Sequence, residues 1–183
     1  AMARPGSRMP RPPLDDKRLE EMALRYVGKY ATSRAKLIGY LARKVRERGW
    51  DGASEPALNA LADRFGELGY VDDAAYALAK SRSLSSRGYG KRRLEEKLRH
   101  SGIGEKDGAA AREHSEREAV DSALRYAERR RIGPFGDTSA DPNRRERALA
   151  AMIRAGHSFQ LAKIIVEWPA GTPLDLGEIA DRA

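Results

Sequence analysis

The feature that most constrains this chain is a recurring helix stop, in which a glycine is followed by an aromatic or other bulky residue. It occurs at Gly49-Trp50, Gly69-Tyr70 and Gly102-Ile103, with a weaker copy at Gly156-His157. A glycine just past a helix takes the left-handed conformation at little cost, and the next residue packs back on the helix. Glycines 49, 102 and 156 are spaced by 53 and 54 residues, which predicts a tandem array of three-helix units.

Apolar residues spaced by three and four predict helices along most of the chain, and no stretch alternates convincingly enough to be a strand. The fourth helix is expected from Asp72 to about Arg87 and the fifth over 91–100, while 105–114 is ambiguous between a short helix and a loop. The other helices are expected to begin at Asp15, Thr32 or Ser33, Ser54, Ser115, Asp141 and Ser158. The predicted fold class is therefore all-α.

The charge balance limits the partners of the chain. With 35 Lys and Arg against 27 Asp and Glu, the net charge is +8 and the pI is near 9.9. Such a chain favours polyanions or acidic protein surfaces. The absence of cysteine fits a reducing compartment, and we find neither a signal peptide nor an apolar run long enough to span a bilayer. We expect a cytoplasmic protein that does not bind membranes.

Positive charge is concentrated between Lys80 and Arg99, where eight Lys or Arg stand against Glu95 and Glu96 alone. The segment spans Gly88 and Gly90, a hinge at which backbone could approach a partner closely. A charge run is more often a solvated helix face, but this clustering favours a partner or nucleic-acid site. The residues that we assign to it are Arg82, Arg87, Tyr89, Lys91, Arg92, Arg93 and Arg99.

Catalytic, cofactor and metal chemistry find no support in the sequence. The run SSRGYGKRR fails as a nucleotide loop, because Ser85 and Arg92 stand where the motif needs glycine and Ser or Thr. Asp72 and Asp73 suit helix capping. The three histidines lie too far apart for a helix-pair zinc site and suit surface or packing roles. We therefore predict no catalytic residue, no cofactor and no metal.

Three segments carry a resemblance to a known family. They are ALRYVGKYATSRAKLIGYLARKV (23–45), ELGYVDDAAYALAKSRSLSSRGYGKRRLEEKLRHSGI (67–103) and, more weakly, RAGHSFQLAKIIVEW (154–168). Together the chain resembles the RecX family, regulators of the bacterial recombinase RecA. The likeness covers roughly residues 20–168, and the central segment is the most characteristic. The third repeat departs from the pattern at Gly156-His157-Ser158-Phe159.

The resemblance implies three tandem three-helix repeats, in an array that we expect to be elongated and curved. The expected divisions are a disordered basic tail (1–13), repeats at 14–69, 70–114 and 115–168, and a C-terminal tail (169–183). The resemblance also implies a protein that binds RecA filaments and contacts single-stranded DNA directly or through the filament. We expect this protein to be a monomer. Such proteins damp ATP hydrolysis, strand exchange and cleavage of the SOS repressor.

Two classes of function remain open from the sequence. The first is a regulator whose basic helical surface docks on the recombinase filament. The second is a stand-alone basic helical protein that binds or organises DNA without the recombinase. An enzyme is a distant third, since no catalytic constellation is found.

Overall fold

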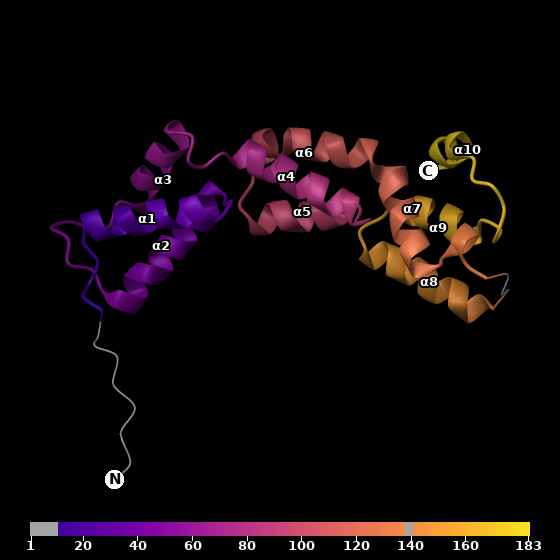
Figure 1. Cartoon of the computed structure of the whole chain (residues 1–183), viewed down its shortest axis with the longest axis horizontal. Coiled ribbons are helices and arrows are strands. Elements are labelled where there is room, and N and C mark those ends of the chain that lie inside the picture. The colour runs from indigo at the N-terminus through magenta and orange to yellow at the C-terminus, as the bar shows by residue number, and fades with distance from the viewer. Residues whose placement is uncertain (1–10, 138–140) are drawn as a thin grey trace, which may run out of the picture. The chain divides into compact units, whose positions relative to one another are not determined.

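A computed structural model of the chain describes residues 11–137 and 141–183. Within these residues there are ten α-helices and one 3-10 helix, and no β-strand (Figure 1). The helices are α1 (Asp16–Lys29), α2 (Arg34–Arg48), α3 (Leu58–Glu67), α4 (Asp73–Ser86), α5 (Lys91–His100), α6 (Glu105–Arg117), α7 (Ala119–Arg130), η1 (Gly133–Phe135), α8 (Pro142–Arg154), α9 (Phe159–Glu167) and α10 (Leu176–Arg182). The predicted all-α class is confirmed.

The chain divides into two compact units, one ending at Asp72 and the other spanning Asp73–Ala183. The first unit is built on α1, α2 and α3, whose buried side chains form one core around Leu37, Leu41 and Phe65. Leu14, just before α1, completes this core. Its amide donates to the Gly49 carbonyl at 2.9 Å, and its carbonyl accepts from the Asp51 amide at 2.8 Å.

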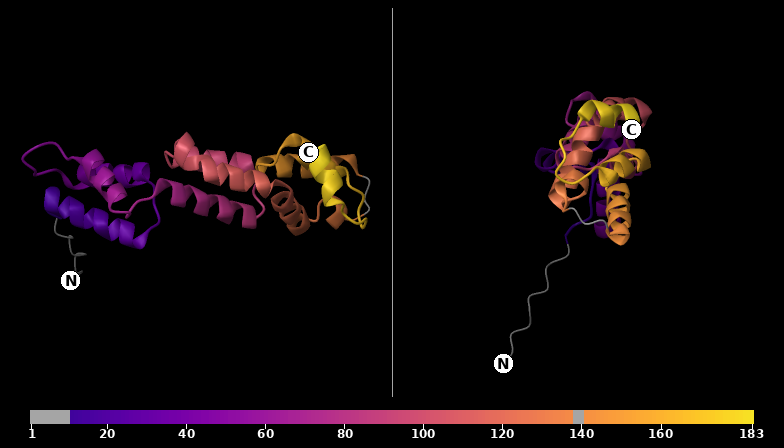
Figure 2. Two further views of the ribbon diagram at one scale, coloured as in Figure 1. Left: turned by 90° about the horizontal axis from the view of Figure 1, so that it is seen from above. Right: turned by 90° about the vertical axis from the view of Figure 1, so that its right-hand side faces the viewer.

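The second unit contains two cores. One gathers Tyr76, Leu84, Leu94 and Leu98 from α4 and α5, with Ala111 of α6. The other draws its buried residues from α7, α8, α9 and α10. Three consecutive groups of three helices thus each bury their own apolar faces, and α10 packs against α9 and α7 (Figure 2). The residue bounds of the three repeats stay a prediction.

Helices α4 and α6 make the most extensive helix contact of the second unit. Their buried positions are small: Ala77, Ser81 and Ser85 on α4, and Gly108, Ala111 and Ser115 on α6. Small side chains let two backbones approach closely. The Ser81 hydroxyl donates to the Ala111 carbonyl at 2.8 Å and lies 3.0 Å from Nδ1 of His114, which fixes the register of the pair.

Three of the four predicted glycine stops share one backbone geometry. Gly69, Gly102 and Gly156 have φ of 75°, 67° and 99°. At each of them the following residue donates its amide to the carbonyl five positions back, as in Tyr70 to Phe65 at 2.9 Å. This is the hydrogen bond expected of a left-handed helix cap. Gly49 also has a positive φ (83°), but its ψ of 166° is not that of a left-handed helix cap, and Trp50 beside it forms a β-bridge with Leu14 instead.

Several boundaries differ from the expected ones. Helix α3 begins at Leu58 rather than at Ser54, and the helix expected to run on from Ser115 is split at Glu118 into α6 and α7. The expected C-terminal tail contains α10, which Asp175 caps and which buries Ile179 completely. Of the expected disordered tail, residues 1–10 lie outside the described residues, whereas Pro12 accepts hydrogen bonds from the Arg48 guanidinium at 2.7 and 3.1 Å.

Candidate partner-binding site

The seven predicted site residues all lie in the second unit, on two helices and their link. Arg82 is on α4, Arg87 and Tyr89 lie between α4 and α5, and the remaining four are on α5. Helix α5 turns Leu94 and Leu98 into the core, and its four predicted site residues are exposed. Arg92 and Arg99 are seven residues apart and therefore share one face of the helix.

The structure brings three of the seven together. The guanidinium of Arg87 lies 5.5 Å from the ring centroid of Tyr89, and that of Arg93 lies 5.9 Å from it. Cations over an aromatic ring are attracted by its negative face. Tyr89 itself is half-buried and packs against both cores of the unit. The ring therefore anchors two arginines at the surface, which we call the Tyr89 cluster (Arg87, Tyr89, Arg93).

The acids near these cations are already engaged. Arg112 of α6 grips Glu95 with Nε–Oε1 and Nη2–Oε2 distances of 2.8 and 3.3 Å, and this hydrogen bonding raises the pKa of Arg112. Glu96 accepts from Arg93 at 3.4 Å. Lys91 pairs with Glu116, and the hydrogen bond from Lys91 lowers the pKa of Glu116. Lys91 is thus neutralised within the chain.

Three arginines of the set keep uncompensated charge. Arg82, Arg92 and Arg99 are exposed and have no hydrogen-bond or ion-pair partner for their side chains among residues 11–137 and 141–183. Arg87 bonds only the Ser83 carbonyl, at 3.1 Å, so its charge also remains available. These four arginines are the ones that an anionic partner could bind without first breaking an ion pair.

The glycines of the link between α4 and α5 pack against the chain's own backbone. They therefore do not form the hinge expected there, at which backbone could approach a partner. Gly88, Gly90 and Gly156 are all buried. The Gly90 amide donates to the Ala155 carbonyl at 2.9 Å, and the Arg92 amide donates to the Gly156 carbonyl at 3.1 Å. A Cβ on Gly90 would stand 2.5 Å from the Gly156 carbonyl carbon, too close for any side chain. The link is therefore locked against the turn between α8 and α9.

His157 completes this lock, which is the packing role among the two roles, surface or packing, expected of the histidines. Its Nε2 donates to the Gly88 carbonyl at 3.0 Å, and its ring lies 5.9 Å from that of Tyr126. Burial lowers the pKa of His157, an effect that the hydrogen bond to Gly88 opposes only in part. The ring is therefore neutral near pH 7, with its proton on Nε2.

The structure brings together a second group of arginines in the same unit, which the sequence alone did not single out as a site. Arg130 is the last residue of α7 and Arg131 follows it, whereas Arg144, Arg145 and Arg147 lie on α8; all five line one pocket of about 550 Å³. The runs RRR (129–131) and RRER (144–147) are visible in the sequence. Because a loop separates the two runs, the sequence does not show that they meet in space.

Apart from Phe65, the aromatic residues of the first unit are only partly buried. Tyr26 and Tyr40 stack with their centroids 4.0 Å apart, and Tyr30 beside them is 49% exposed. Phe65 is buried, whereas Tyr70 packs edge-on against it and remains 51% exposed. Tyr30 and Tyr70 therefore lie at the surface of the first unit rather than in its core.

Two further observations bear on function. Within the part of the chain that the structure describes, no helix is long and apolar enough to cross a membrane. No group of three or more acidic or histidine side chains is placed to hold a metal ion, again among those residues.

Comparisons with known proteins agree with one another. Residues 72–111 match the family described as "RecX, second three-helix domain". The chain is 33% identical over 160 residues to a Myxococcus xanthus protein named regulatory protein RecX, covering 81% of this chain and 84% of that protein. It is 32% identical over 159 residues to regulatory protein RecX of Mycobacterium sp. (strain KMS), covering 80% and 81%.

A solved structure supports the likeness of fold. The coordinates described as "Crystal structure of regulatory protein RecX" match with a TM-score of 0.59, covering 83% of this chain and 71% of that chain. The two chains are only 18% identical in sequence, so this match shows a similar fold and nothing about function. All seven predicted site residues fall within the matched segment 72–111.

Proposed function

The chain belongs to the RecX family of regulatory proteins, and from that premise we propose that it regulates the RecA recombinase in the cytoplasm. In this proposal a monomer binds the RecA filament on single-stranded DNA, touching the strand directly or through the filament. It inhibits ATP hydrolysis, strand exchange and cleavage of the SOS repressor. It acts by binding and not as an enzyme.

The observation that carries the proposal is the similarity over four-fifths of the chain to proteins named regulatory protein RecX. The exposed arginines of α4 and α5 support it. Arg82, Arg87, Arg92 and Arg99 have no acidic partner among the described residues, so they can meet phosphates or acidic side chains at no loss of an existing ion pair. Guanidinium groups bind both kinds of anion through paired N–H donors.

The lock formed by Gly88, Gly90 and Gly156 supports a rigid presentation of these arginines. Because the link between α4 and α5 is bonded to the α8–α9 turn, the start of α5 cannot swing freely. A rigid surface loses less conformational entropy on binding than a mobile one. The arginines near this link, Arg87 and Arg92, are therefore the best placed to contribute to affinity.

The test is inhibition of RecA's DNA-dependent ATP hydrolysis. A filament regulator should inhibit well below one chain per recombinase monomer, because one bound chain affects many filament subunits. A protein that only binds DNA would act by competing for the strand, and excess DNA would then relieve all inhibition. That second result would favour the stand-alone DNA-binding function instead.

A further inference from the structure

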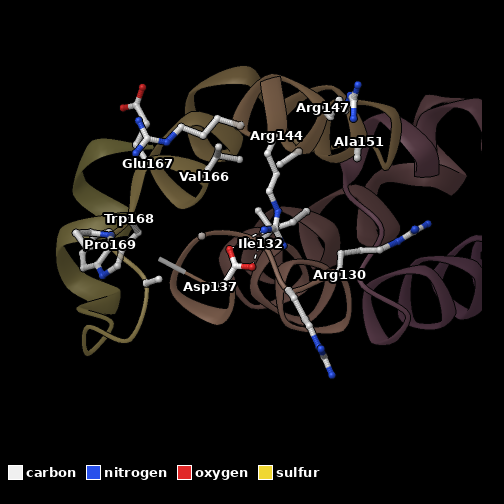
Figure 3. A pocket seen from close by; sticks show the side chains of 16 residues that line it. Arg130, Ile132, Asp137, Arg144, Arg147, Ala151, Val166, Glu167, Trp168 and Pro169 are labelled. Atoms are coloured by element: carbon white, nitrogen blue, oxygen red, sulfur yellow. Dashed lines mark hydrogen bonds and ion pairs between the residues drawn. The ribbon is translucent and has the colours of Figure 1, made fainter. Parts of the chain in front are cut away.

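The arginine pocket of the second unit is separate from the predicted site on α4 and α5. It has a volume of about 550 Å³ and opens between the end of α7, η1, α8 and the end of α9. Five arginines line it against two acids, Asp137 and Glu167. Figure 3 shows Trp168 and Pro169 at one end, Arg130 at the other, and Arg144 between them reaching toward Asp137.

The charge in the pocket is only partly compensated. Nη1 of Arg144 lies 2.6 Å from both carboxylate oxygens of Asp137, so this pair is neutral. Arg131, Arg145 and Arg147 are exposed, and their side chains have no hydrogen-bond or ion-pair partner in the described part of the chain. Like charges gathered around one concave surface repel one another, and a bound anion would relieve that repulsion.

The backbone at Arg131 points to the same conclusion. Arg131 has φ 54° and ψ 52°, and it is the one non-glycine residue with positive φ within residues 11–137 and 141–183. The next amide, of Ile132, donates to the Ala127 carbonyl at 2.8 Å, which is the same cap that glycine makes at Gly69, Gly102 and Gly156. An arginine thus stands where glycine would be less strained. Strain of this kind is concentrated at binding and active sites.

The other wall of the pocket is apolar. Ile132 and Val166 are almost fully buried beneath it, and the half-buried indole of Trp168 lines its end. Nε1 of Trp168 donates to the Pro173 carbonyl at 3.3 Å, which restrains the ring. A ligand that fits must therefore combine a flat apolar part with negative charge, in a volume typical of small-ligand sites.

We propose that this pocket binds one nucleoside phosphate unit, with the base against Trp168 and the phosphate held by Arg131, Arg145 and Arg147. Indole rings stack on bases, and guanidinium forks match phosphate oxygens. An acidic peptide would satisfy the arginines but would leave the indole and the apolar wall without a flat partner. The unit comes either from single-stranded DNA or from a free nucleotide, which share this chemistry.

The inference rests on the proposed function, because the pocket would be the place where the chain contacts the DNA strand of the filament. The test does not need the recombinase. The chain has two tryptophans, so a Trp50→Phe background leaves Trp168 as the fluorescent reporter of the pocket. The probes are a short thymidine oligonucleotide, thymidine monophosphate and poly-glutamate, each titrated at low salt.

The variant is Arg145→Gln with Arg147→Gln, and the matched control is Arg154→Gln with Lys163→Gln. Both remove two positive charges from exposed positions of the second unit, and neither breaks an ion pair between described residues. We expect the oligonucleotide to quench Trp168 saturably, with affinity reduced about tenfold or more by the variant. The control should bind as the unaltered chain does. Circular dichroism checks that both remain helical.

The remaining outcomes distinguish single-stranded DNA from a free nucleotide, and both of them from an acidic protein segment. Equal affinity for thymidine monophosphate would make a free nucleotide the ligand, and preference for the oligonucleotide would make it the strand; both support the proposal. No quenching, or equal losses in variant and control, would overturn it. Poly-glutamate binding as tightly as the oligonucleotide would assign the pocket to acidic protein segments and also overturn it. If the pocket fails while the unaltered chain still inhibits ATP hydrolysis by RecA, the proposed function stands.

Discussion

Nε2 of His157 lies 3.0 Å from the carbonyl oxygen of Gly88, a residue 69 positions earlier in the chain. The bond is buried, and it joins the link between α4 and α5 to the turn between α8 and α9. The two cores of the second unit therefore meet at a polar contact that depends on the protonation of one ring. Four predictions follow from this contact, from the glycines around it and from the arginines nearby.

Acidification should destabilise the second unit. Burial lowers the pKa of His157 from its usual 6.5, so the unfolded chain takes up this proton at a higher pH than the folded chain. The contribution of the neutral ring is complete above pH 6.5 and is lost as the pH falls toward the lower pKa of the folded state. Urea unfolding followed by Trp168 fluorescence in a Trp50→Phe background, at several pH values, measures it. His157→Gln retains an N–H donor but cannot titrate, so its stability should vary less; an equal pH dependence would contradict the assignment.

Gly90→Ala should weaken the same contact. Its Cβ would meet the carbonyl carbon of Gly156 at 2.5 Å and the amide nitrogen of His157 at 2.7 Å, and backbone atoms cannot move aside cheaply. We expect a loss of roughly 1–3 kcal/mol in the free energy of unfolding, as for other overpacked sites. Gly104→Ala is the control, because no atom lies within 4 Å of its Cβ. Similar denaturation midpoints for the two variants would show that the lock contributes little.

Charge reversal on α5 should impair regulation without unfolding the chain. Arg92→Glu with Arg93→Glu places two acids on an exposed helix start, and we expect inhibition of recombinase ATP hydrolysis to weaken about tenfold or more. Helicity should be unchanged, since the exposed pair of Arg93 with Glu96 contributes little. Arg154→Glu with Lys163→Glu makes the same change of net charge elsewhere in the unit. If the control weakened inhibition equally, overall charge rather than α5 would be responsible.

Arg131→Gly should separate stability from binding. Glycine takes the left-handed conformation at φ 54° more readily than arginine, so the free energy of unfolding should rise by up to about 1 kcal/mol. Nucleotide binding to the pocket should weaken, because one of its uncompensated arginines is gone. Denaturation and Trp168 fluorescence measure the two effects on one sample. A variant that is more stable and binds equally well would remove Arg131 from the pocket's function.

The helix stops were predictable because each depends on adjacent residues. A glycine at Gly69 or Gly102 followed by Tyr70 or Ile103 determines the cap wherever the helix lies in the fold. Helix α5 (Lys91–His100) likewise has the predicted bounds, since Leu94 and Leu98 mark its buried face and Gly90 and Gly102 frame it.

Helix α6 was ambiguous for a physical reason. It buries Gly108, Ala111 and Ser115 against α4, and such small residues leave no apolar periodicity to read. Helix α10 was missed because Pro169, Gly171 and Pro173 precede it, and its short apolar face carries a single fully buried residue, Ile179.

The site was only partly predictable. The basic residues of α5 were found from charge density, but the sequence could not show that Lys91 is paired with Glu116 or that Gly88 and Gly90 face the chain's own backbone. Both facts depend on residues 25 or more positions away. The arginine pocket was hidden for the same reason. A loop separates α7 from α8, so the sequence does not show that their arginines line one pocket.

The alanine, serine and glycine residues that α4 and α6 bury against each other have a mechanical consequence for this helix pair. Bulky side chains between two helices can change rotamer and so accommodate a displacement. Small side chains between two closely packed main chains allow no such adjustment. A force applied at Arg82 would therefore be transmitted from α4 to α6 with little deformation of the contact, and the two helices would move together as one rigid unit.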